Sequence, residues 1–220
     1  MDEPKVRRRY HSLQRQTQAQ LTRRAILEAA RRLFGAHGYA ATTLPAIAGE
    51  AGVSAPTVTA IFGTKARLLD ALIKLAVRGD TTSSPLADRP WWQEMLAEPD
   101  PKEQLRLHAT TTRQVHERSA DVAEIVRGAA TADPEIASLL RQRGALRLRD
   151  MRTVVESLAG KHALVPGMTI DQAMDLLWAL TAADLYRLLV VERGWPPSQY
   201  ERWLASSLIQ SLLEHGHTAS

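Results

Sequence analysis

Residues 42–65 have the sequence TTLPAIAGEAGVSAPTVTAIFGTK, and this segment predicts two short helices joined by a turn. Thr43 and Ser54 are of the type that caps helix starts, and a proline follows each of them within the first turn, where helices tolerate it. Gly52 lies between the two helices and can turn the chain at no side-chain cost. The segment therefore predicts a helix-turn-helix, the unit whose second helix enters the major groove of DNA.

Helical periodicity extends over most of the remaining chain, because apolar residues recur at intervals of three and four. No run of β-branched residues alternates for long enough to predict a strand. Residues 79–90 are dense in Gly, Ser, Thr, Asp and Pro, which predicts a loop. The fold class is therefore all-α, with helices expected over about 21–37, 44–51, 55–62, 65–77, 101–117, 121–130, 134–158, 170–193 and 197–213.

Positive charge is concentrated in the first third of the chain. The net charge of +4 arises from 28 Lys and Arg against 24 Asp and Glu, but residues 1–75 alone hold twelve basic and five acidic side chains. Such asymmetry indicates a module that faces a polyanion, joined to a module with another role. A solvated basic tail would explain Arg7–Arg9 equally well.

Several classes of function are excluded or disfavoured by residue types. The chain has no cysteine, so disulfides and cysteine-ligated metal sites are excluded. No segment has the roughly 20 apolar residues of a membrane span, and the first twenty residues lack the apolar core of a secretory signal, so a cytoplasmic protein without a membrane partner is expected. Catalytic motifs are missing, and His108 and His116 have no carboxylate at ligand spacing. We therefore expect no catalytic residues, no metal and no cofactor.

The segment around the two short helices resembles the N-terminal domain of TetR/AcrR-type bacterial transcription regulators. The resemblance covers about residues 20–75. It implies an all-helical homodimer whose first three helices bind double-stranded operator DNA, a fourth helix that leads to a larger domain, and a small-molecule pocket and dimer interface in that domain. The expected division is a basic mobile arm at 1–18, a DNA-binding domain at 19–78 and a ligand-binding and dimerisation domain at 79–220. The residues that carry the resemblance are Ile26-Leu27, Ala29-Ala30, Leu33-Phe34, Thr42-Thr43, Ile47-Ala48, Ala51-Gly52-Val53-Ser54, Thr57, Phe62 and Lys65.

The second short helix departs from the family pattern. Thr59 stands where family members usually carry tyrosine, and Ile61 where they often carry histidine or tyrosine. No arginine or asparagine is available on this helix for bidentate base contacts, so methyl groups, threonine hydroxyls and DNA shape are left to specify sequence. The arm around Arg7–Arg9, or Arg15, or Arg23–Arg24 at the helix start, is therefore expected to take a large share of DNA binding. Lys65 is the best single phosphate contact, unless it only faces solvent. The predicted DNA-binding residues are Arg23, Arg24, Thr43, Ser54, Ala55, Pro56, Thr57, Thr59, Ala60 and Lys65.

The C-terminal two-thirds are expected to hold the pocket and the dimer interface. The predicted helix 170–193 is apolar on nearly every side, so it must be covered on more than one face. With the last helix it resembles the helix pair by which family members dimerise, although both helices could instead fill a monomeric core. Predicted interface residues are Leu180, Leu188, Leu204, Leu208 and Leu212. Predicted ligand-binding residues are Trp92, Met95, His108, Thr112, His116, Met151, Trp178 and Tyr186, for a small apolar or aromatic effector.

The leading hypothesis is a ligand-responsive transcription regulator, a repressor that a small molecule releases from a palindromic operator. The alternative is a DNA-binding dimer with no small-molecule effector, whose C-terminal domain serves only dimerisation or a protein partner. A third hypothesis, an all-helical enzyme with a basic arm, has no motif in its favour.

Overall fold

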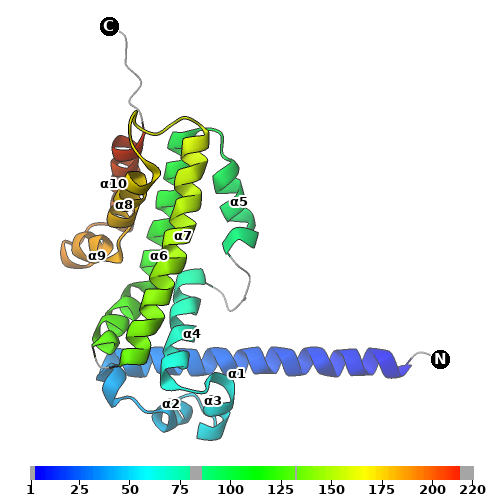
Figure 1. Ribbon diagram of the computed structural model, residues 1–220. Helices are drawn as coiled ribbons and strands as arrows, with labels where there is room; N and C mark the ends of the chain where they lie inside the picture. The colour runs from blue at the N-terminus through cyan, green and yellow to red at the C-terminus, as the bar shows by residue number, and fades with distance from the viewer. Residues whose placement is uncertain (1–2, 80–85, 132, 214–220) are drawn as a thin grey trace. The chain divides into compact units, whose positions relative to one another are not determined.

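The computed structural model of the chain describes residues 3–79, 86–131 and 133–213, and the side chains from residue 17 onward within these ranges (Figure 1). These residues are helical outside the turns and loops, with one isolated bridge between Leu164 and Leu213, which agrees with the predicted all-α class. The elements are α1 (Glu3–Ala41), α2 (Leu44–Glu50), α3 (Ala55–Phe62), α4 (Lys65–Arg78), η1 (Leu86–Asp88), α5 (Pro90–Ala97), α6 (Pro101–Ala130), α7 (Pro134–Gly160), α8 (Ile170–Leu180), α9 (Ala183–Tyr186), the π-helical η2 (Arg187–Glu192) and α10 (Pro197–Leu212).

The chain divides into two compact units, each with its own core. Unit 1 consists of Met1–Leu75 and Asp121–Ala137, and unit 2 of Ala76–Ala120 and Ser138–Ser220. The segment 121–137 was expected in the C-terminal domain, but it packs with the N-terminal helices. Two contacts within unit 1 give the physical reason: Arg31 donates to both carboxylate oxygens of Asp121 at 2.5 Å, and the Tyr39 hydroxyl donates to Asp133 at 2.8 Å.

In unit 1, α1, α2, α3 and the first part of α4 surround an apolar core. Its fully buried side chains come from each of these helices and follow the helical spacing seen in the sequence. Gly38, where the sequence predicted a helix stop, has a φ of 78°, and the helical assignment continues beyond this kink to Ala41. The large buried residues of this core include Ile26, Leu27, Phe34, Ile47, Val58, Leu68 and Leu69.

The N-terminal end of α1 lies in the segment 1–18, which was expected to be a basic mobile arm that could continue into the first helix. The backbone is helical from Glu3, so the helix extends well upstream of the predicted start near Leu21. Residues 3–20 contain no proline after Pro4 and no glycine, and nothing in them breaks a helix. The side chains of Arg7–Arg9 and Arg15 lie outside the described part of the chain.

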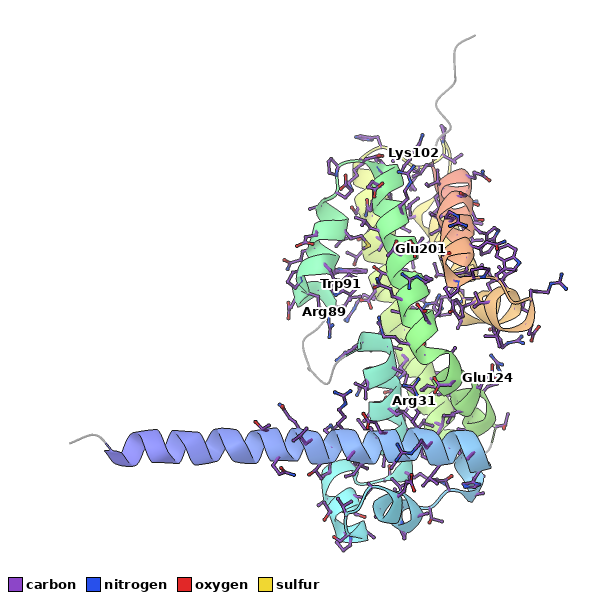
Figure 2. The ribbon with its side chains drawn as sticks, turned by 180° about the vertical axis from the view of Figure 1, so that it is seen from behind. Arg31, Arg89, Trp91, Lys102, Glu124 and Glu201 are labelled. Atoms are coloured by element: carbon purple, nitrogen blue, oxygen red, sulfur yellow. The ribbon has the colours of Figure 1, made fainter. Side chains whose placement is uncertain are left out.

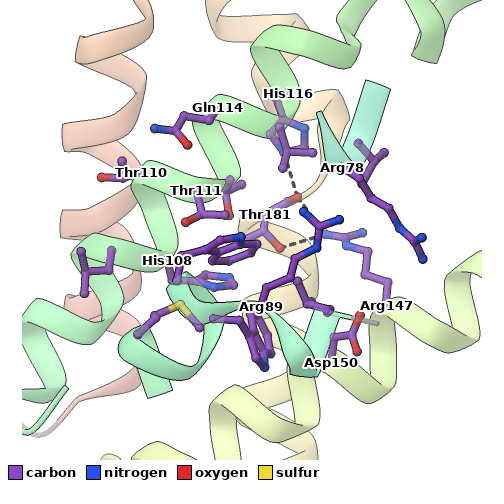
Figure 3. A pocket seen from close by; sticks show the side chains of 18 of the residues that line it. Arg78, Arg89, His108, Thr110, Thr111, Gln114, His116, Arg147, Asp150 and Thr181 are labelled. Atoms are coloured by element: carbon purple, nitrogen blue, oxygen red, sulfur yellow. Dashed lines mark hydrogen bonds between the residues drawn. The ribbon is translucent and has the colours of Figure 1, made fainter. Parts of the chain in front are cut away.

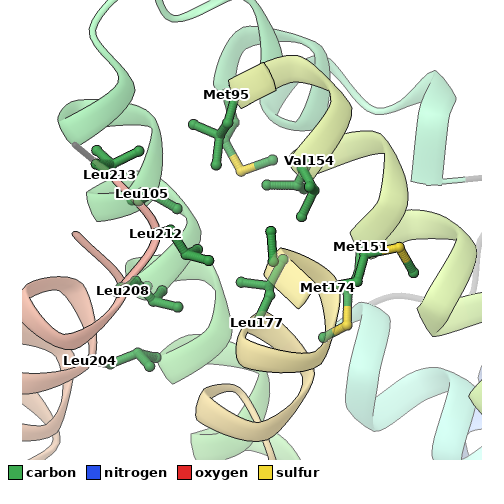
Figure 4. Close-up of a cluster of buried hydrophobic side chains, with 14 of the residues drawn as sticks. Met95, Leu105, Met151, Val154, Met174, Leu177, Leu204, Leu208, Leu212 and Leu213 are labelled. Carbon is green, nitrogen blue, oxygen red and sulfur yellow. The ribbon is translucent and has the colours of Figure 1, made fainter. Parts of the chain in front are cut away.

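Unit 2 has an apolar core formed by α5, the first part of α6, the later part of α7, α8 and α10 (Figure 4). Met95 reaches this core from α5, a helix that the sequence analysis missed because it follows directly on the Gly- and Pro-rich loop. The loop that follows α5 is fixed by Lys161, the residue after α7, whose ammonium donates to the carbonyls of Leu96 and Glu98. The core residues labelled in Figure 4 are Met95, Leu105, Met151, Val154, Met174, Leu177, Leu204, Leu208, Leu212 and Leu213.

Two predicted helix boundaries in this region were wrong. The helices expected at 101–117 and 121–130 are one continuous α6, in which the Ser119 hydroxyl donates to the Val115 carbonyl at 2.7 Å and does not cap a new helix. The helix expected at 170–193 ends instead at Leu180, and Thr181 forms its C-cap. The Thr181 hydroxyl donates to the Leu177 carbonyl at 2.6 Å, and the chain restarts as α9 and η2.

Candidate nucleic-acid interface and ligand cavity

The helix-turn-helix of unit 1 has the caps that its sequence predicted. The Thr43 hydroxyl accepts a hydrogen bond from the Ala46 N–H at 3.2 Å, and the Ser54 hydroxyl accepts from the Thr57 N–H at 3.3 Å. Gly52 has a φ of 67°, a conformation that favours glycine. The N–H of Val53 then donates back to the Ala48 carbonyl at 2.9 Å, which closes the turn between α2 and α3.

Helix α3 presents a small and weakly polar outer face. Val58 and Phe62 anchor it, since both are buried in unit 1. Of the predicted base-reading residues, Ser54, Pro56, Thr59 and Ala60 are exposed, whereas Ala55 and Thr57 are half-buried. The Thr57 and Ser54 hydroxyls lie 2.8 Å apart, and the Thr59 hydroxyl donates to the Ala55 carbonyl at 3.2 Å. These hydroxyls retain acceptor capacity toward a DNA partner.

The two arginines predicted at the start of the first DNA-binding helix have different surroundings on α1. The Arg23 guanidinium lies 4.5 Å from the centre of the Phe62 ring, so this contact links α1 to α3. Arg24 is exposed and pairs with Glu28 at 2.9 Å. Exposed pairs of this kind contribute little to stability, and a phosphate can compete with the glutamate for the arginine.

Lys65 has a contact set that sequence reasoning did not foresee. Its ammonium donates to the carbonyls of Tyr39 at 2.8 Å, Thr42 at 3.0 Å and Ala40 at 3.3 Å, and it lies 4.3 Å from the Tyr39 ring centre. These carbonyls belong to the end of α1 and the link to α2, where helix geometry leaves acceptors without partners. In this arrangement, Lys65 stabilises unit 1, and its role as a phosphate contact stays a prediction.

Arg67 is a basic residue near α3 that the sequence analysis did not single out. It is exposed in the first turn of α4, and its side chain lies beside Gly63, the C-cap of α3. Thr64 caps this turn, because its hydroxyl accepts from the Arg67 N–H at 3.1 Å. The only sequence signal was a second basic residue two positions after Lys65.

Unit 2 contains a cavity of about 480 Å³ between α5, α6, α7 and the end of α8 (Figure 3). Six of the eight predicted ligand-binding residues line it: Trp92, Met95, His108, Thr112, His116 and Met151. Trp178 and Tyr186 lie behind the wall, where Trp178 stacks under Arg147 at 4.3 Å and Tyr186 meets the His116 ring at 5.6 Å. The wall also includes Arg147, Asp150 and Thr181, which no sequence motif marked.

The polar end of the cavity is organised around Thr181. Nη2 of Arg147 lies 2.8 Å from both the carbonyl and the hydroxyl oxygen of Thr181, and His116 Nε2 lies 3.2 Å from the same carbonyl (Figure 3). Burial, with a smaller effect from the charge of Arg147, lowers the pKa of His108 to about 4. The pKa of His116 is lowered to about 4 by burial and by Arg147, against a hydrogen bond with Thr181 that raises it. Both histidines are therefore neutral at pH 7.

A second polar contact fixes α10 against α6 on another side of unit 2. Figure 2 labels Glu201 on α10. Its carboxylate accepts from the Thr110 hydroxyl at 2.9 Å and from Arg113 Nε at 2.8 Å. Arg113 also pairs with Glu117 at 2.6 Å, so this guanidinium has two carboxylate partners. Arg147, which lines the cavity, has no carboxylate partner among the described residues.

The predicted dimer interface needs correction. Leu204, Leu208 and Leu212 are fully buried in the core of unit 2, because their stripe of α10 faces α8 and α6 (Figure 4). They are therefore not available to a second copy of the chain. Of the other two predicted residues, Leu180 is half-buried and Leu188 is 40% exposed. Leu176 and Val191 are also exposed near them in sequence, at 36% and 62%.

The described residues show neither a cluster of metal ligands nor a membrane-spanning helix. Nowhere in these ranges do three or more His, Asp or Glu side chains gather in a way that could hold a metal ion. Among the same residues, no helix combines the length and the apolar character that crossing a membrane requires.

Comparison with known proteins adds a family and a set of similar folds. Residues 26–72 match the family model of bacterial regulatory proteins of the tetR family. A search of curated proteins finds no match. NalD, the secondary repressor of the MexAB-OprM multidrug efflux pump in Pseudomonas aeruginosa, superposes with a TM-score of 0.68 at 24% identity, over 88% of this chain and 96% of that one.

SmeT, the repressor of the Stenotrophomonas maltophilia multidrug efflux pump SmeDEF, is also similar in fold. Its complex with triclosan gives a TM-score of 0.69 at 20% identity, over 90% of this chain and 94% of that one. These structures share the all-helical architecture, with the helix-turn-helix at the N-terminal end. The family match over 26–72 contains α2 and α3 with their caps, and so this segment of unit 1 is similar to the helix-turn-helix domain of bacterial regulatory proteins of the tetR family.

Proposed function

We propose that this chain is a ligand-responsive repressor that binds a palindromic operator as a homodimer and releases it when a small molecule occupies the cavity of unit 2. Release requires that the ligand bind the DNA-incompetent state more tightly than the DNA-bound state. The observation that carries the proposal is the cavity of about 480 Å³ with a mostly apolar wall and a polar end, in a chain that also has a helix-turn-helix.

The DNA-binding part of the proposal rests on the outer face of α3 and its neighbours. Two half-sites one helical turn apart, about 34 Å, require a two-fold symmetric dimer. The exposed small residues of α3 favour methyl and hydroxyl contacts over bidentate base contacts, so affinity has to come largely from phosphates. Arg24 and Arg67, together with the basic residues of 1–18, are the sources of that affinity.

The effector part rests on the cavity and is supported by the relatives. A DNA-binding dimer without an effector has no need of an open cavity, whereas a ligand site of several hundred Å³ is typical of small-molecule binding. NalD and SmeT are repressors of multidrug efflux pumps, and SmeT forms a complex with triclosan. These similarities support a repressor with an effector that has an apolar or aromatic body.

The decisive experiment begins by recovering and sequencing genomic DNA that the full-length protein binds. We expect a short sequence with two-fold symmetry, a footprint that covers both halves, and a dimer in solution. Deleting residues 1–18 is expected to weaken binding and to flatten the dependence of affinity on salt, because the arm has Lys5, Arg7–Arg9 and Arg15. A footprint without symmetry, or a monomer at micromolar concentration, would contradict the proposal.

A further inference from the structure

Arg147 is a half-buried cation at the end of the cavity, and several contacts fix the position of its side chain. One face of the guanidinium stacks on Trp178 at 4.3 Å, and Nη2 donates to the carbonyl and hydroxyl of Thr181. A third, longer contact of 3.4 Å runs from Nη2 to the Trp178 carbonyl. All of these hydrogen bonds use a single nitrogen, so Nε and Nη1 are left without hydrogen-bond partners among the described residues.

The second property of Arg147 is that the described residues give it no carboxylate partner. Other arginines of unit 2 behave differently: Arg113 pairs with Glu201 and Glu117, and Arg152 pairs with Asp171 at 2.9 Å. Burial lowers the pKa of Arg147, which is the expected effect of desolvation on an unpaired cation. A buried charge without a counter-charge is costly, and a bound anion would offset that cost.

Two further polar groups close to Arg147 have no hydrogen-bond partner in the described structure. They are Nε2 of His108, which lines the cavity, and the hydroxyl of the fully buried Tyr200 on α10. The charge of Arg147 affects the pKa of His108, and Tyr200 affects that of Arg147, so the three groups are electrostatic neighbours. Buried polar groups are normally satisfied, and a ligand is a ready explanation for the unpartnered nitrogen of His108, because this residue lines the cavity.

The acidic residues of the wall do not neutralise this end of the cavity. Asp150 is half-buried, and burial raises its pKa, while the charges of Arg149 and Arg78 lower it. Glu94 is exposed on α5. The wall as a whole has four arginines, Arg78, Arg89, Arg118 and Arg147, against these two acids. A cationic ligand would therefore meet a site of unfavourable charge.

We propose that the effector is an amphipathic anion, with a carboxylate that binds Nε and Nη1 of Arg147 and an apolar or aromatic body that packs against Trp92, Met95 and Met151. This inference rests on the proposed function and specifies the chemistry of its effector. A carboxylate matches the planar fork of a guanidinium with two parallel hydrogen bonds. The apolar side chains of α5 and α7 in the wall supply the surface for the body.

The experiment measures binding of three matched probes to the full-length protein by titration calorimetry. The probes are 2-naphthylacetate, 2-naphthylethanol and 2-naphthylethyl-trimethylammonium, which share a ring system and differ in head-group charge. We expect the carboxylate to bind about tenfold or more tightly than the alcohol, as one charge-assisted hydrogen-bonded pair predicts. Equal or tighter binding of the alcohol or the ammonium compound overturns the inference, as does a lack of binding by all three.

Variants of Arg147 separate the head-group contact from folding. Arg147→Met is expected to remove the preference for the carboxylate, whereas Arg147→Lys, which retains the charge, is expected to keep part of it. Arg141→Met is the matched control, because Arg141 is an exposed arginine of the same helix outside the cavity wall. If Arg147→Met does not fold, the preference for the carboxylate over the alcohol is compared between Arg147→Lys and Arg141→Met. An unchanged preference in Arg147→Lys together with a reduced preference in Arg141→Met contradicts the inference.

The same probes distinguish this inference from the proposed function. Operator release is measured separately, by fluorescence anisotropy of labelled operator DNA with each probe. If the carboxylate binds through Arg147 but leaves DNA binding unchanged, the head-group inference stands and the effector mechanism fails. If a neutral or cationic probe releases the DNA, the effector mechanism stands and the head-group inference fails.

Discussion

Arg147 of α7 lies 2.8 Å from both the carbonyl and the hydroxyl oxygen of Thr181, the residue that ends α8. His116 of α6 contacts the same carbonyl at 3.2 Å. Side chains from α6 and α7, two helices that line the cavity, therefore both contact Thr181 at the end of α8. A ligand that draws Arg147 or His116 away from Thr181 removes partners from this helix end, which gives the cavity a direct physical connection to α8 and to the chain that follows it.

The first prediction concerns the Thr181 hydroxyl. Thr181→Val keeps the shape of the side chain but removes an oxygen that donates to the Leu177 carbonyl and accepts from Arg147. Chemical denaturation should show a loss of about 1–3 kcal/mol in unfolding free energy, the usual cost of leaving buried polar groups unpaired. Thr153→Val is the control, since Thr153 is exposed and its hydroxyl contacts only the Arg149 carbonyl. An equal loss in both variants would contradict the assigned role.

The second prediction concerns the pH dependence of stability. The pKa of His108 and of His116 is lowered to about 4, mainly by burial, whereas an unfolded histidine titrates near 6.5. The unfolded state therefore binds more protons between these values, and stability falls as pH decreases from about 6.5 to about 4. The loss is expected to reach up to about 3 kcal/mol for each histidine.

The measurement is urea denaturation at several pH values across this window. His108→Gln and His116→Gln should each flatten the curve, and His162→Gln, at an exposed position, should not. Asp150 opposes part of the dependence, because burial raises its pKa and its contribution is lost as pH rises. The comparison between variants is therefore more informative than the slope of the unmodified protein. An unchanged slope in both histidine variants would be the contradicting result.

Much of the fold followed from local sequence signals. Thr43, Ser54 and Gly52 each have a chemical role that depends only on nearby backbone, so the helix-turn-helix could be located from residue types alone. Helix and unit boundaries that depend on residues far away in the sequence could not be predicted in this way. The break at Thr181 is stabilised by Arg147, thirty-four positions away, and residues 121–137 join unit 1 through Arg31 and Tyr39.

The residues of the candidate site also divide into those that the sequence analysis named and those that it missed. Trp92, Met95 and His108, which the sequence analysis named as ligand-binding residues, line the cavity, and their role in binding a ligand stays a prediction. Arg147 was not expected, since an arginine at a helical position is usually a solvated charge and only burial distinguishes it. The stripe of Leu204 and Leu208 was assigned to the wrong contact, because periodicity identifies an apolar face but not its partner.

The third prediction concerns Lys65. Lys65→Met keeps the aliphatic stem and removes the ammonium that donates to the carbonyls of Tyr39, Ala40 and Thr42. We expect the unfolding free energy to fall by about 1–2 kcal/mol, because a charged donor to helix-end carbonyls is lost from a partly exposed site. The slope of log Kd for operator DNA against log salt should stay unchanged.

A direct phosphate contact predicts a different result for the same variant. Loss of one lysine–phosphate pair lowers the salt slope by about one and leaves the fold intact. Lys74→Met is the matched control on α4, where the lysine is exposed and pairs with Asp70 at 2.7 Å. A lower salt slope with unchanged stability in Lys65→Met would show that Lys65 contacts a DNA phosphate.

The fourth prediction concerns the surface by which two copies of the chain associate. Leu176, Leu188 and Val191 are exposed apolar residues of α8 and η2, while the leucines of α10 are buried in the core, so we expect the interface to use the former. Val191→Glu is expected to shift the protein from dimer to monomer in light scattering, and to weaken operator binding by at least about tenfold, because two half-sites are no longer bound together. Leu146→Glu introduces the same charge at a leucine of α7 that is 50% exposed, and it should leave the dimer intact. If the dimer persists in Val191→Glu and Leu188→Glu but dissociates in Leu146→Glu, the prediction is wrong and the interface lies on α7.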